Sequence, residues 1–408
     1  MYQLIVFDLV VLFALNLPFF NWYVGILLSL CMTLSFFAFR LYDLENVQNY
    51  NEQLIRTTVG TIFSFILVLF FYPLFEKDIT RYNFFYNFLI SVVLIPPINT
   101  LFGKLLIKNQ PTKTFLVVGK KEEIEPILKE IEEKTMGKYR FAEYINPTVE
   151  TLKRKVTHYD GVLLADPEFE DVLKKVNINR VEYLPNLVER TLKRIPLKVL
   201  EKFREYYEVA FDNVSDDSPS KRILDIVVSL VALAVFSPIM LVVAIIIYLE
   251  DGLPVAFRQK RVGKDGKVFT MMKFRSMRNV PKDSPKFVDQ EKDRILKVGR
   301  FIRPLRFDEV LQFINVLRGD MSVVGPRPEQ EEFVRIFEKQ IPFYHLRHKV
   351  KPGITGWAQL MYKYSSNLEE VKKKLSYDLW YVKNRNIFLD LRIILQTVEA
   401  VLWRRGAK

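Results

Sequence analysis

The chain has 408 residues, of which 50% are hydrophobic and 14% aromatic, yet it carries a formal net charge of +13. Its apolar residues gather in long uncharged segments, which is typical of a membrane protein. The single cysteine, Cys31, excludes a disulfide framework. The first residues show neither a basic start nor a small-residue cleavage site, so we predict a retained anchor rather than a secretory signal peptide.

Four apolar segments lie in the first quarter of the chain. Residues 22–39, 57–75 and 82–103 carry no charge and have the length of about 17 to 25 residues that a transmembrane helix needs. Residues 2–20 are a fourth candidate, which Asp8 and Asn16 weaken. We therefore predict a four-helix transmembrane region over residues 1–108. Lysines that follow residue 103 place the rest of the chain on the cytoplasmic side.

Residues 112–215 have the pattern of a small α/β domain. Strand-like segments at 114–119, 160–165 and 181–184 alternate with helical patterns, which predicts a parallel, Rossmann-like sheet. The first turn, at 117–123, has one glycine where a dinucleotide fingerprint needs about three. We therefore predict a regulatory or spacer domain rather than a nucleotide site, and the sequence names no ligand for it.

A polar linker at residues 212–220 predicts that a new unit begins near residue 221 and continues to 408. Its first element, residues 222–249, contains 24 consecutive uncharged residues, with Ser237 and Pro238 in the middle. Proline removes a backbone hydrogen bond and bends a helix. A crossing at this point would place the basic region that follows outside the cell, so we predict a re-entrant helix, with a kinked span as the alternative.

Residues 254–351 carry 23 Lys and Arg against 12 Asp and Glu, which is most of the net charge. Such a field suits nucleic acid, an anionic membrane surface or a phosphorylated substrate. Nucleic acid is excluded as the preferred partner, because the apolar segments bring this region to lipid headgroups and no nucleic-acid-binding motif is present.

Asp308 and Glu309 form an adjacent carboxylate pair that arginines surround. Acidic residues are favoured in the first turn of a helix, so a purely structural role is the alternative. The motif GDMSVVGPRP at 319–328 favours chemistry instead. The pair would supply a nucleophile and a base or metal ligand, while Arg303, Arg306 and Arg327 would bind phosphate oxygens.

Five ordered motifs carry a resemblance to a known family. They are RQKRVGKDGKVF at 258–269, KFRSM at 273–277, RFDE at 306–309, NVLRGDMSVVGPRP at 315–328 and KPGITGWAQ at 351–359. Residues 221–408 thereby resemble the bacterial sugar transferases, which are polyprenyl-phosphate sugar-1-phosphate transferases. The whole predicted architecture is similar to the large exopolysaccharide-initiating members: a membrane protein with four N-terminal helices, an α/β domain and a mainly α-helical catalytic domain.

The resemblance implies a reaction and its partners. A sugar 1-phosphate would pass from a UDP-sugar to undecaprenyl phosphate with release of UMP, as the first membrane step of exopolysaccharide, capsule or O-antigen synthesis. Asp308 would be the nucleophile and a ligand of Mg²⁺, and Glu309 would assist it. Mg²⁺ and guanidinium groups would offset the charge of the diphosphate. The enzyme would work at the cytoplasmic face of the bacterial inner membrane, in contact with membrane lipid.

The resemblance also assigns further residues. Arg303 and Arg327 would hold phosphate, Lys273, Arg275 and Asp378 would lie at or near the site, and Ser237 with Pro238 would form the break of the re-entrant helix. The family's Asn-Gly-Arg after Gly-Trp-Ala-Gln is absent, which leaves Lys363 as a candidate substitute. Residues 386–403 are predicted as a helix that lies on the membrane surface or packs on the core.

Two other functions remain open at this point: a catalytically silent membrane scaffold, and a transferase for a different phosphorylated head group. The sequence identifies neither the sugar nor the polysaccharide pathway. It also leaves the oligomeric state open, including a homo-oligomer.

Overall fold

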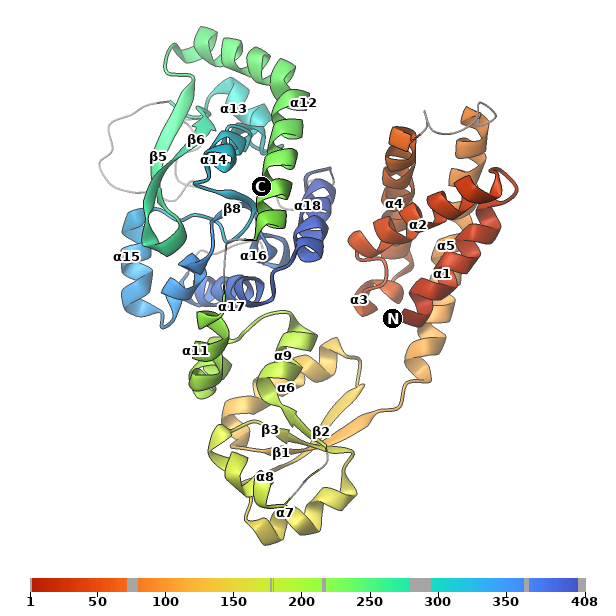
Figure 1. Ribbon diagram of the computed structural model, residues 1–408, viewed down its shortest axis with the longest axis vertical. Coiled ribbons are helices and arrows are strands. Elements are labelled where there is room, and N and C mark those ends of the chain that lie inside the picture. Colours follow the sequence, from red (N-terminus) through yellow and green to blue (C-terminus); the bar gives the residue numbers. More distant parts are fainter. Residues whose placement is uncertain are drawn as a thin grey trace. The chain divides into compact units, whose positions relative to one another are not determined.

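The computed structural model describes residues 2–71, 80–176, 178, 180–214, 218–278, 295–362 and 367–402. The chain divides into two compact units, Met1–Leu184 and Pro185–Lys408. The secondary structure is mostly helical, with several apolar helices and a parallel sheet (Figure 1).

The first unit begins with an apolar helical bundle. Its helices are α1 (Tyr2–Asn16), α2 (Trp22–Ala38), α3 (Leu44–Val47), α4 (Tyr50–Phe71) and α5 (Arg81–Lys108). α1 packs on α2 and α5, and α4 packs on α2 and α5, so the four longer helices form a closed ring. In the described part of the bundle, Tyr50–Leu69 and Arg81–Lys108 are long and apolar enough to cross a membrane. α1 and α2 are shorter, at 15 and 17 residues.

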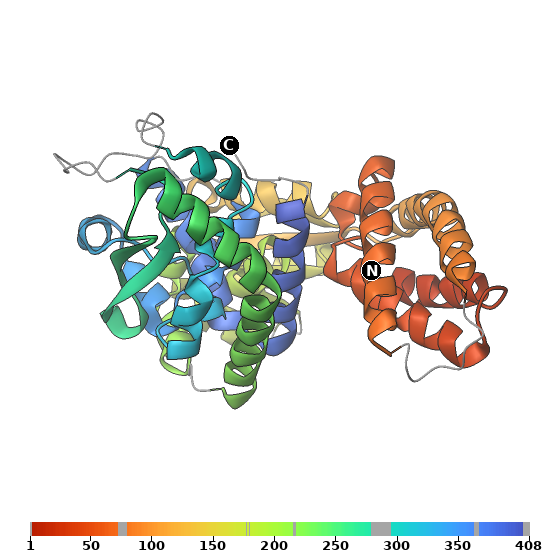
Figure 2. The same cartoon turned by 90° about the horizontal axis from the view of Figure 1, so that it is seen from above.

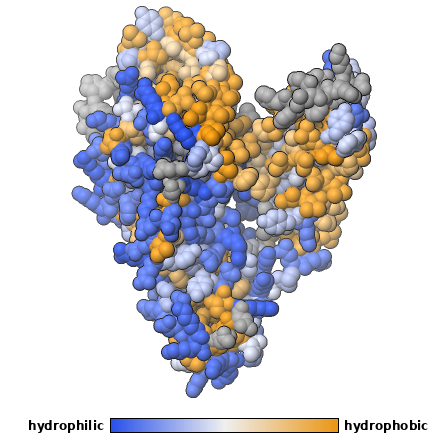
Figure 3. All heavy atoms as spheres, in the orientation of Figure 1, coloured by the Kyte–Doolittle hydropathy of each residue, from blue (hydrophilic) through white to orange (hydrophobic). Residues whose placement is uncertain are grey.

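The two polar residues that weaken the first predicted segment lie in the middle of this bundle. Asp8 and Asn16 are completely buried. Nδ2 of Asn99 donates to Oδ2 of Asp8 at 2.8 Å, and Nδ2 of Asn87 donates to Oδ1 of Asn16 at 2.6 Å. Both donors belong to α5, so polar contacts join the first and last helices of the bundle. Outward-facing side chains are apolar, and Figure 3 shows the bundle surface as largely hydrophobic.

We expect Asn99→Leu to destabilise the bundle, because it leaves a buried carboxyl group without its donor. Loss of one partner of a buried hydrogen bond costs about 1 to 3 kcal/mol, whereas replacement of both partners is nearly neutral. Thermal unfolding of the detergent-solubilised protein should therefore show a lower midpoint for Asn99→Leu and recovery in the double variant with Asp8→Leu. A single variant as stable as the wild type would contradict this interpretation.

An α/β domain completes the first unit. Its elements are β1 (Lys113–Val118), α6 (Lys121–Lys134), β2 (Tyr139–Ile145), α7 (Val149–Lys155), η2 (Val156–His158), β3 (Gly161–Leu164), η3 (Pro167–Phe169), α8 (Glu170–Val176) and β4 (Val181–Tyr183). The strands are parallel in the order β2-β1-β3-β4. The central strands β1 and β3 pair along Leu116↔Val162 and Val118↔Leu164. All four of these side chains are apolar and buried. The parallel sheet is the one predicted.

The second unit is mainly helical. Its helices are α9 (Leu184–Leu192), α10 (Leu197–Lys202), α11 (Arg204–Asp212), α12 (Pro219–Asp251), α13 (Lys297–Ile302), α14 (Gln312–Arg318), α15 (Glu331–Gln340), α16 (Trp357–Met361), α17 (Leu368–Asn384) and α18 (Ile387–Leu402). Short 3-10 turns are η4 (Lys264–Gly266), η7 (Phe307–Glu309) and η8 (Tyr344–Lys349). An antiparallel hairpin joins β5 (Ala256–Val262) and β6 (Val268–Phe274), and a parallel pair joins β7 (Ser322–Val324) and β8 (Gly353–Thr355).

Helix α12 is the longest helix described, and it bends in its middle (Figure 1). Pro238 has no N–H to donate to the carbonyl of Ala234, and Oγ of Ser237 donates to that oxygen instead, at 2.8 Å. The helix therefore stays continuous through the bend, where the sequence predicts a break. Its apolar side chains are largely exposed, since only 11% of its most apolar stretch is buried. Figure 3 shows apolar surface over its second half.

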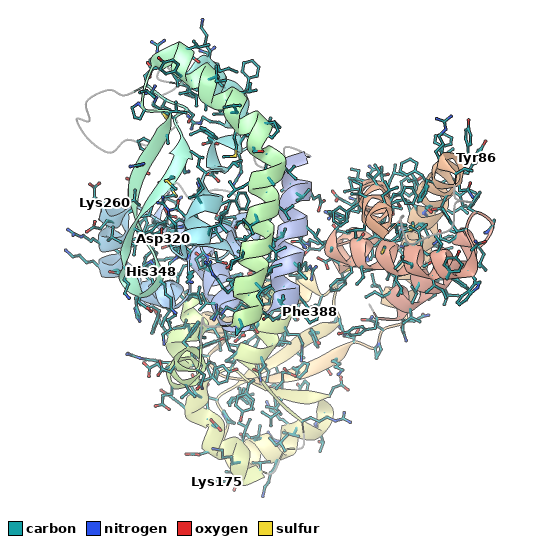
Figure 4. The ribbon with its side chains drawn as sticks, turned by 45° about the horizontal axis from the view of Figure 1, so that its top comes forward. Tyr86, Lys175, Lys260, Asp320, His348 and Phe388 are labelled. Carbon is teal, nitrogen blue, oxygen red and sulfur yellow. The ribbon has the colours of Figure 1, made fainter. Side chains whose placement is uncertain are left out.

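The first turns of α12 are fixed to the rest of the second unit. Nζ of Lys221 donates to Oδ2 of Asp390 on α18 at 2.7 Å. Oδ1 of Asp225 accepts from the backbone N–H of Val323 and from Oγ of Ser322, each at 2.9 Å. α18 accordingly lies alongside this half of α12 (Figures 1 and 2). Phe388, labelled in Figure 4, is 79% exposed on α18.

Residues 185–212 belong to the second unit. The indole N–H of Trp380 donates to the carbonyl of Glu189 at 3.1 Å, and that of Trp357 donates to the carbonyl of Lys193 at 2.9 Å. The two indole rings lie 5.2 Å apart. Helix α9 thus packs directly on α16 and α17.

Candidate active site

The carboxylate pair lies in a single 3-10 turn, η7, after helix α13. Arg306 precedes the pair in the left-handed conformation, with φ of 52°, which turns the chain sharply between α13 and η7. Gly299 lets α13 pack closely against the chain that follows β6, because a Cβ atom at this position would lie 2.3 Å from the carbonyl oxygen of Ser276. These two features bring η7 against β6, which carries Lys273.

Glu309 is held between two cations. Its Oε1 accepts from Nζ of Lys273 and from Nη2 of Arg327, each at 2.9 Å, and the residue is buried. Burial opposes its charge, but Arg327 and then Lys273 outweigh that effect and hold the pKa of Glu309 well below its usual range. The negative charge of Glu309 in turn raises the pKa of the Arg327 guanidinium. Glu309 is therefore a permanent carboxylate that fixes the two cations.

Asp308 has a different environment. Burial, followed by the negative charge of Glu309, raises its pKa to about 6, while Lys273 and Arg303 oppose that rise. In the part of the chain that the structure describes, its carboxylate makes no ion pair. A desolvated carboxylate that is ionised at neutral pH, and has no bound partner, is suited to attack an electrophile or to bind a metal ion.

Arg303 lies at the end of α13, and its Nη1 is buried without a hydrogen-bond partner among the described residues. A buried guanidinium N–H that has no protein partner is suited to bind an anionic oxygen. The structure thus brings together five of the predicted site residues around η7: Lys273, Arg303, Asp308, Glu309 and Arg327. Arg306 is exposed, and its Nη1 donates to Oε1 of Gln359 at 3.4 Å.

Two predicted residues bind elsewhere. Nη2 of Arg275 donates to the carbonyls of Asp251 and Gly252, at 2.8 and 2.6 Å, so Arg275 fixes the C-terminal end of α12. Asp378 on α17 accepts from Nε and Nη2 of Arg347, at 3.2 and 2.9 Å. Nη2 of Arg347 also donates to the carbonyl of Arg327 at 2.9 Å. Asp378 therefore acts on the site through Arg347 and the backbone of Arg327.

Sequence analysis missed three charged residues that support the site. Arg347 is one. Arg261 is another, and its Nη1 donates to the carbonyl of Pro328 at 3.0 Å. The third is Glu329, which accepts from Nζ of Lys374 at 2.9 Å. Burial opposes the charge of Glu329, yet the cations Lys374 and Arg347 lower its pKa to about 2. The available signals were that Glu329 directly follows GPRP and that Arg261 lies in the motif at 258–269, whereas Arg347 lies in none of the five motifs.

A residue at the bend of α12 contacts η7, the turn that carries the carboxylate pair. The ring of Phe236, next to Ser237 and Pro238, lies edge-on to the ring of Phe307 at 5.6 Å and 87°. Phe307 directly precedes Asp308. At the other end of α12, Oε1 and Oε2 of Glu250 accept from the backbone N–H groups of Lys297 and Val298, at 2.5 and 3.1 Å, at the start of α13. Lys260 on β5 points away from α12 (Figure 4).

The side chains around Asp308 offer few ligands for a metal ion. Among the described residues, no three His, Cys, Asp or Glu side chains come together as a metal site. Mg²⁺ commonly uses one or two protein carboxylates together with substrate phosphates and water. Asp308 has a carboxylate available, so the residues present fit a Mg²⁺ ion that is held mainly by a phosphorylated substrate. Lys363 lies outside the described residues.

These observations define a protein with several apolar helices and a carboxylate pair that lies among cationic side chains. Residues 217–404 match the family model described as "Bacterial sugar transferase". A relative from Bacillus subtilis (strain 168), "Uncharacterized sugar transferase EpsL", is 42% identical over 187 residues, which are 46% of this chain and 89% of that protein. The chain belongs to the bacterial sugar transferase family.

Two larger relatives have named activities. The Aeromonas hydrophila protein "UDP-N-acetylgalactosamine-undecaprenyl-phosphate N-acetylgalactosaminephosphotransferase" is 44% identical over 189 residues, 46% of this chain and 45% of that protein. The Klebsiella pneumoniae protein "UDP-glucose:undecaprenyl-phosphate glucose-1-phosphate transferase" is 46% identical over 182 residues, 44% of this chain and 39% of that protein. The match therefore spans less than half of each of these two relatives.

Proposed function

We propose that this protein transfers a sugar 1-phosphate from a UDP-sugar to undecaprenyl phosphate, giving undecaprenyl-diphosphate sugar and UMP. The observation that carries the proposal is Asp308: a half-buried, ionisable carboxylate without an ion-pair partner among the described residues, next to three cationic side chains that suit a diphosphate. Relatives whose names state this class of reaction share the domain that contains it. The step would begin exopolysaccharide, capsule or O-antigen synthesis.

In the proposed first step, a carboxylate oxygen of Asp308 attacks the β-phosphorus of the donor. An aspartyl–phosphorus bond forms, the bond from that phosphorus to the bridging oxygen breaks, and UMP leaves with the bridging oxygen. In the second step, a phosphate oxygen of undecaprenyl phosphate attacks the same phosphorus and regenerates the Asp308 carboxylate. The sugar remains attached to its phosphate throughout, which is why the nucleotide product is UMP.

Charge neutralisation is the main task of the surrounding residues. Arg327, Lys273 and Arg303 would bind the diphosphate oxygens as negative charge moves onto UMP. Glu309 would not take up a proton, because its pKa lies far below neutrality. Its role is to hold Lys273 and Arg327 at fixed positions. Mg²⁺ held by Asp308 and the diphosphate would supply further electrostatic stabilisation of the leaving phosphate.

The same proposal includes a membrane topology. The four N-terminal helices would cross the bacterial inner membrane, and α12 would enter the cytoplasmic leaflet and return, with its bend at Pro238. Two features support the re-entrant path: the bend itself and the exposed apolar surface on both halves of α12. The active site would then lie at headgroup depth on the cytoplasmic face, where a nucleotide and a lipid phosphate can both reach Asp308.

The test is nucleotide release by membranes that contain the intact chain, with a panel of UDP-sugars, Mg²⁺, and undecaprenyl phosphate present or absent. We expect UMP as the nucleotide product, full turnover only with the lipid, and a lipid diphosphate sugar by thin-layer separation. Release of UDP would indicate simple glycosyl transfer and contradict the proposal. No product from any donor would favour the scaffold or a different head group.

The contact between α12 and the catalytic turn gives a separate prediction. Phe236→Ala removes the ring that packs on Phe307, so we expect kcat to fall about tenfold with little change in KM for the donor, because small displacements at a reacting centre are costly. Phe236→Leu should restore most of the activity. Val235→Ala is the matched control, since Val235 is 63% exposed on the same helix. Equal activity of Phe236→Ala and Val235→Ala would contradict the prediction.

A further inference from the structure

A cavity of about 310 Å³ opens in the second unit among α15, η8 and α17. It lies directly after the motif that contains Arg327, because Glu329 forms part of its wall. None of the site residues around Asp308 lines it. Three residues that support the site do line it: Glu329, Arg347 and Asp378.

Aromatic and aliphatic side chains form two facing walls. On one side, the rings of Phe333 and Phe337 lie 6.1 Å apart and nearly parallel, at 15°, and the ring of Tyr344 lies 5.4 Å from that of Phe337. Val371 and Leu375 on α17 line the other side. A slot with such walls suits a flat ring, which can stack on aromatic faces.

The charged groups of the cavity already have partners. Lys374 pairs with Glu329 at 2.9 Å, and Arg347 pairs with Asp378 at 2.9 Å. The interior is therefore close to neutral, and it favours an uncharged group over a phosphate or a carboxylate. At the rim, the side-chain amide of Gln340 makes no hydrogen bond within the described part of the chain. An amide offers one acceptor and two donors to a ligand.

The cavity adjoins the phosphate site through one side chain. Arg347 lines the cavity, and its Nη2 donates to the carbonyl of Arg327, whose own guanidinium binds Glu309. Arg327 and Glu329 are two residues apart, which is about 7 Å of extended chain at most. A ligand with a neutral ring at one end and a diphosphate in its middle can therefore extend from this cavity to Arg327 and on toward Asp308.

We propose that this cavity binds the nucleoside end of the donor, with the pyrimidine ring between the aromatic wall and α17 and the amide of Gln340 at the edge of the base. The inference rests on the proposed function, which supplies a nucleoside diphosphate sugar as the substrate. The sugar end does not fit as well, because it has no flat ring that could stack on the aromatic wall.

The test is equilibrium binding of UMP to the intact protein in detergent, without turnover. Val371→Trp fills the cavity, and we expect it to weaken UMP binding at least tenfold. Glu369→Trp places the same bulk on α17 outside the cavity, where Glu369 is exposed and pairs with Lys372, and should leave UMP binding within twofold. Ribose 5-phosphate, which lacks the base, should bind weakly to the wild type and equally to both variants.

Gln340→Ala is a second variant that cannot disturb the interior, since Gln340 is exposed, and it should weaken UMP binding at least threefold. Unchanged UMP affinity in Val371→Trp and Gln340→Ala, with unfolding midpoints like that of the wild type, would overturn the assignment. A wild type that binds UMP no better than ribose 5-phosphate would overturn it too. Loss of UMP binding in the variants, together with a wild type that releases no UMP from any donor, would support the nucleoside site and sink the proposed reaction.

Discussion

Asp308→Asn is expected to reduce formation of the lipid product at least about a thousandfold, as loss of a catalytic nucleophile does in other enzymes that form covalent intermediates. The substitution keeps the shape of the side chain and removes only the nucleophilic oxygen and its charge. Burial raises the pKa of Asp308 to about 6, so a neutral group costs little at this position. The variant should therefore unfold at the same temperature as the wild type or slightly above it.

The measurement is the amount of undecaprenyl-diphosphate sugar formed from a labelled UDP-sugar, together with the thermal unfolding midpoint of each protein. Asp265→Asn is the matched control. Asp265 is exposed in η4 with φ of 54°, a conformation that Asn adopts as readily as Asp, and it should keep full activity. Product formation by Asp308→Asn within tenfold of the wild type would show that the nucleophile is another group.

Arg275 is a case in which a sequence motif does not predict where a side chain binds. The motif KFRSM places Lys273 and Arg275 two residues apart, and on a continuing strand both side chains would share one face. β6 ends at Phe274, however, so the alternation ends before Arg275. Arg275 turns to the carbonyls at the end of α12, which would otherwise lack donors. The resemblance to the family placed Lys273 and Arg275 together at or near the site, and the structure brings Lys273, but not Arg275, into contact with the carboxylate pair.

Strand β2 was missed because charged side chains interrupt its apolar pattern. It pairs only with β1, and its residues alternate between buried Tyr139 and Phe141 and exposed Arg140. Edge strands tolerate such charges, which hides them among charged helical patterns. The predicted strands near 114–119 and 160–165 were apparent because both are central in the sheet and contain the apolar runs 115–118 and 162–165.

The division of the chain shows another limit. The predicted α/β domain, residues 112–215, spans the point between Leu184 and Pro185 at which the two compact units divide. β4 leads into α9 with no linker, so composition gives no signal there. The linker at residues 212–220 was recognised from its polar composition. The contacts that tie α9 to the second unit come from Trp357 and Trp380, more than 150 positions along the chain, and no local pattern predicts them.

Glu309→Gln is expected to have the largest effect on stability. In the wild type, one carboxylate oxygen pairs with both Lys273 and Arg327, whose side chains are 16% and 32% exposed. The amide keeps the size of the side chain but leaves two largely buried cations without their counter-charge. Breaking such a pair by removal of one partner costs about 3 to 5 kcal/mol. We expect an unfolding midpoint several degrees lower, and a loss of activity of about a hundredfold as Lys273 and Arg327 lose their fixed positions.

The two roles of Glu309 can be separated by a second substitution. Lys273→Met removes one cation, so the double variant Glu309→Gln/Lys273→Met should recover part of the lost stability while it remains inactive, because neighbouring charges are not additive. Glu331→Gln breaks an exposed pair with Arg335 on α15 and should change the midpoint very little. If Glu309→Gln were as stable and as active as Glu331→Gln, the Glu309 carboxylate would not be the group that fixes the two cations.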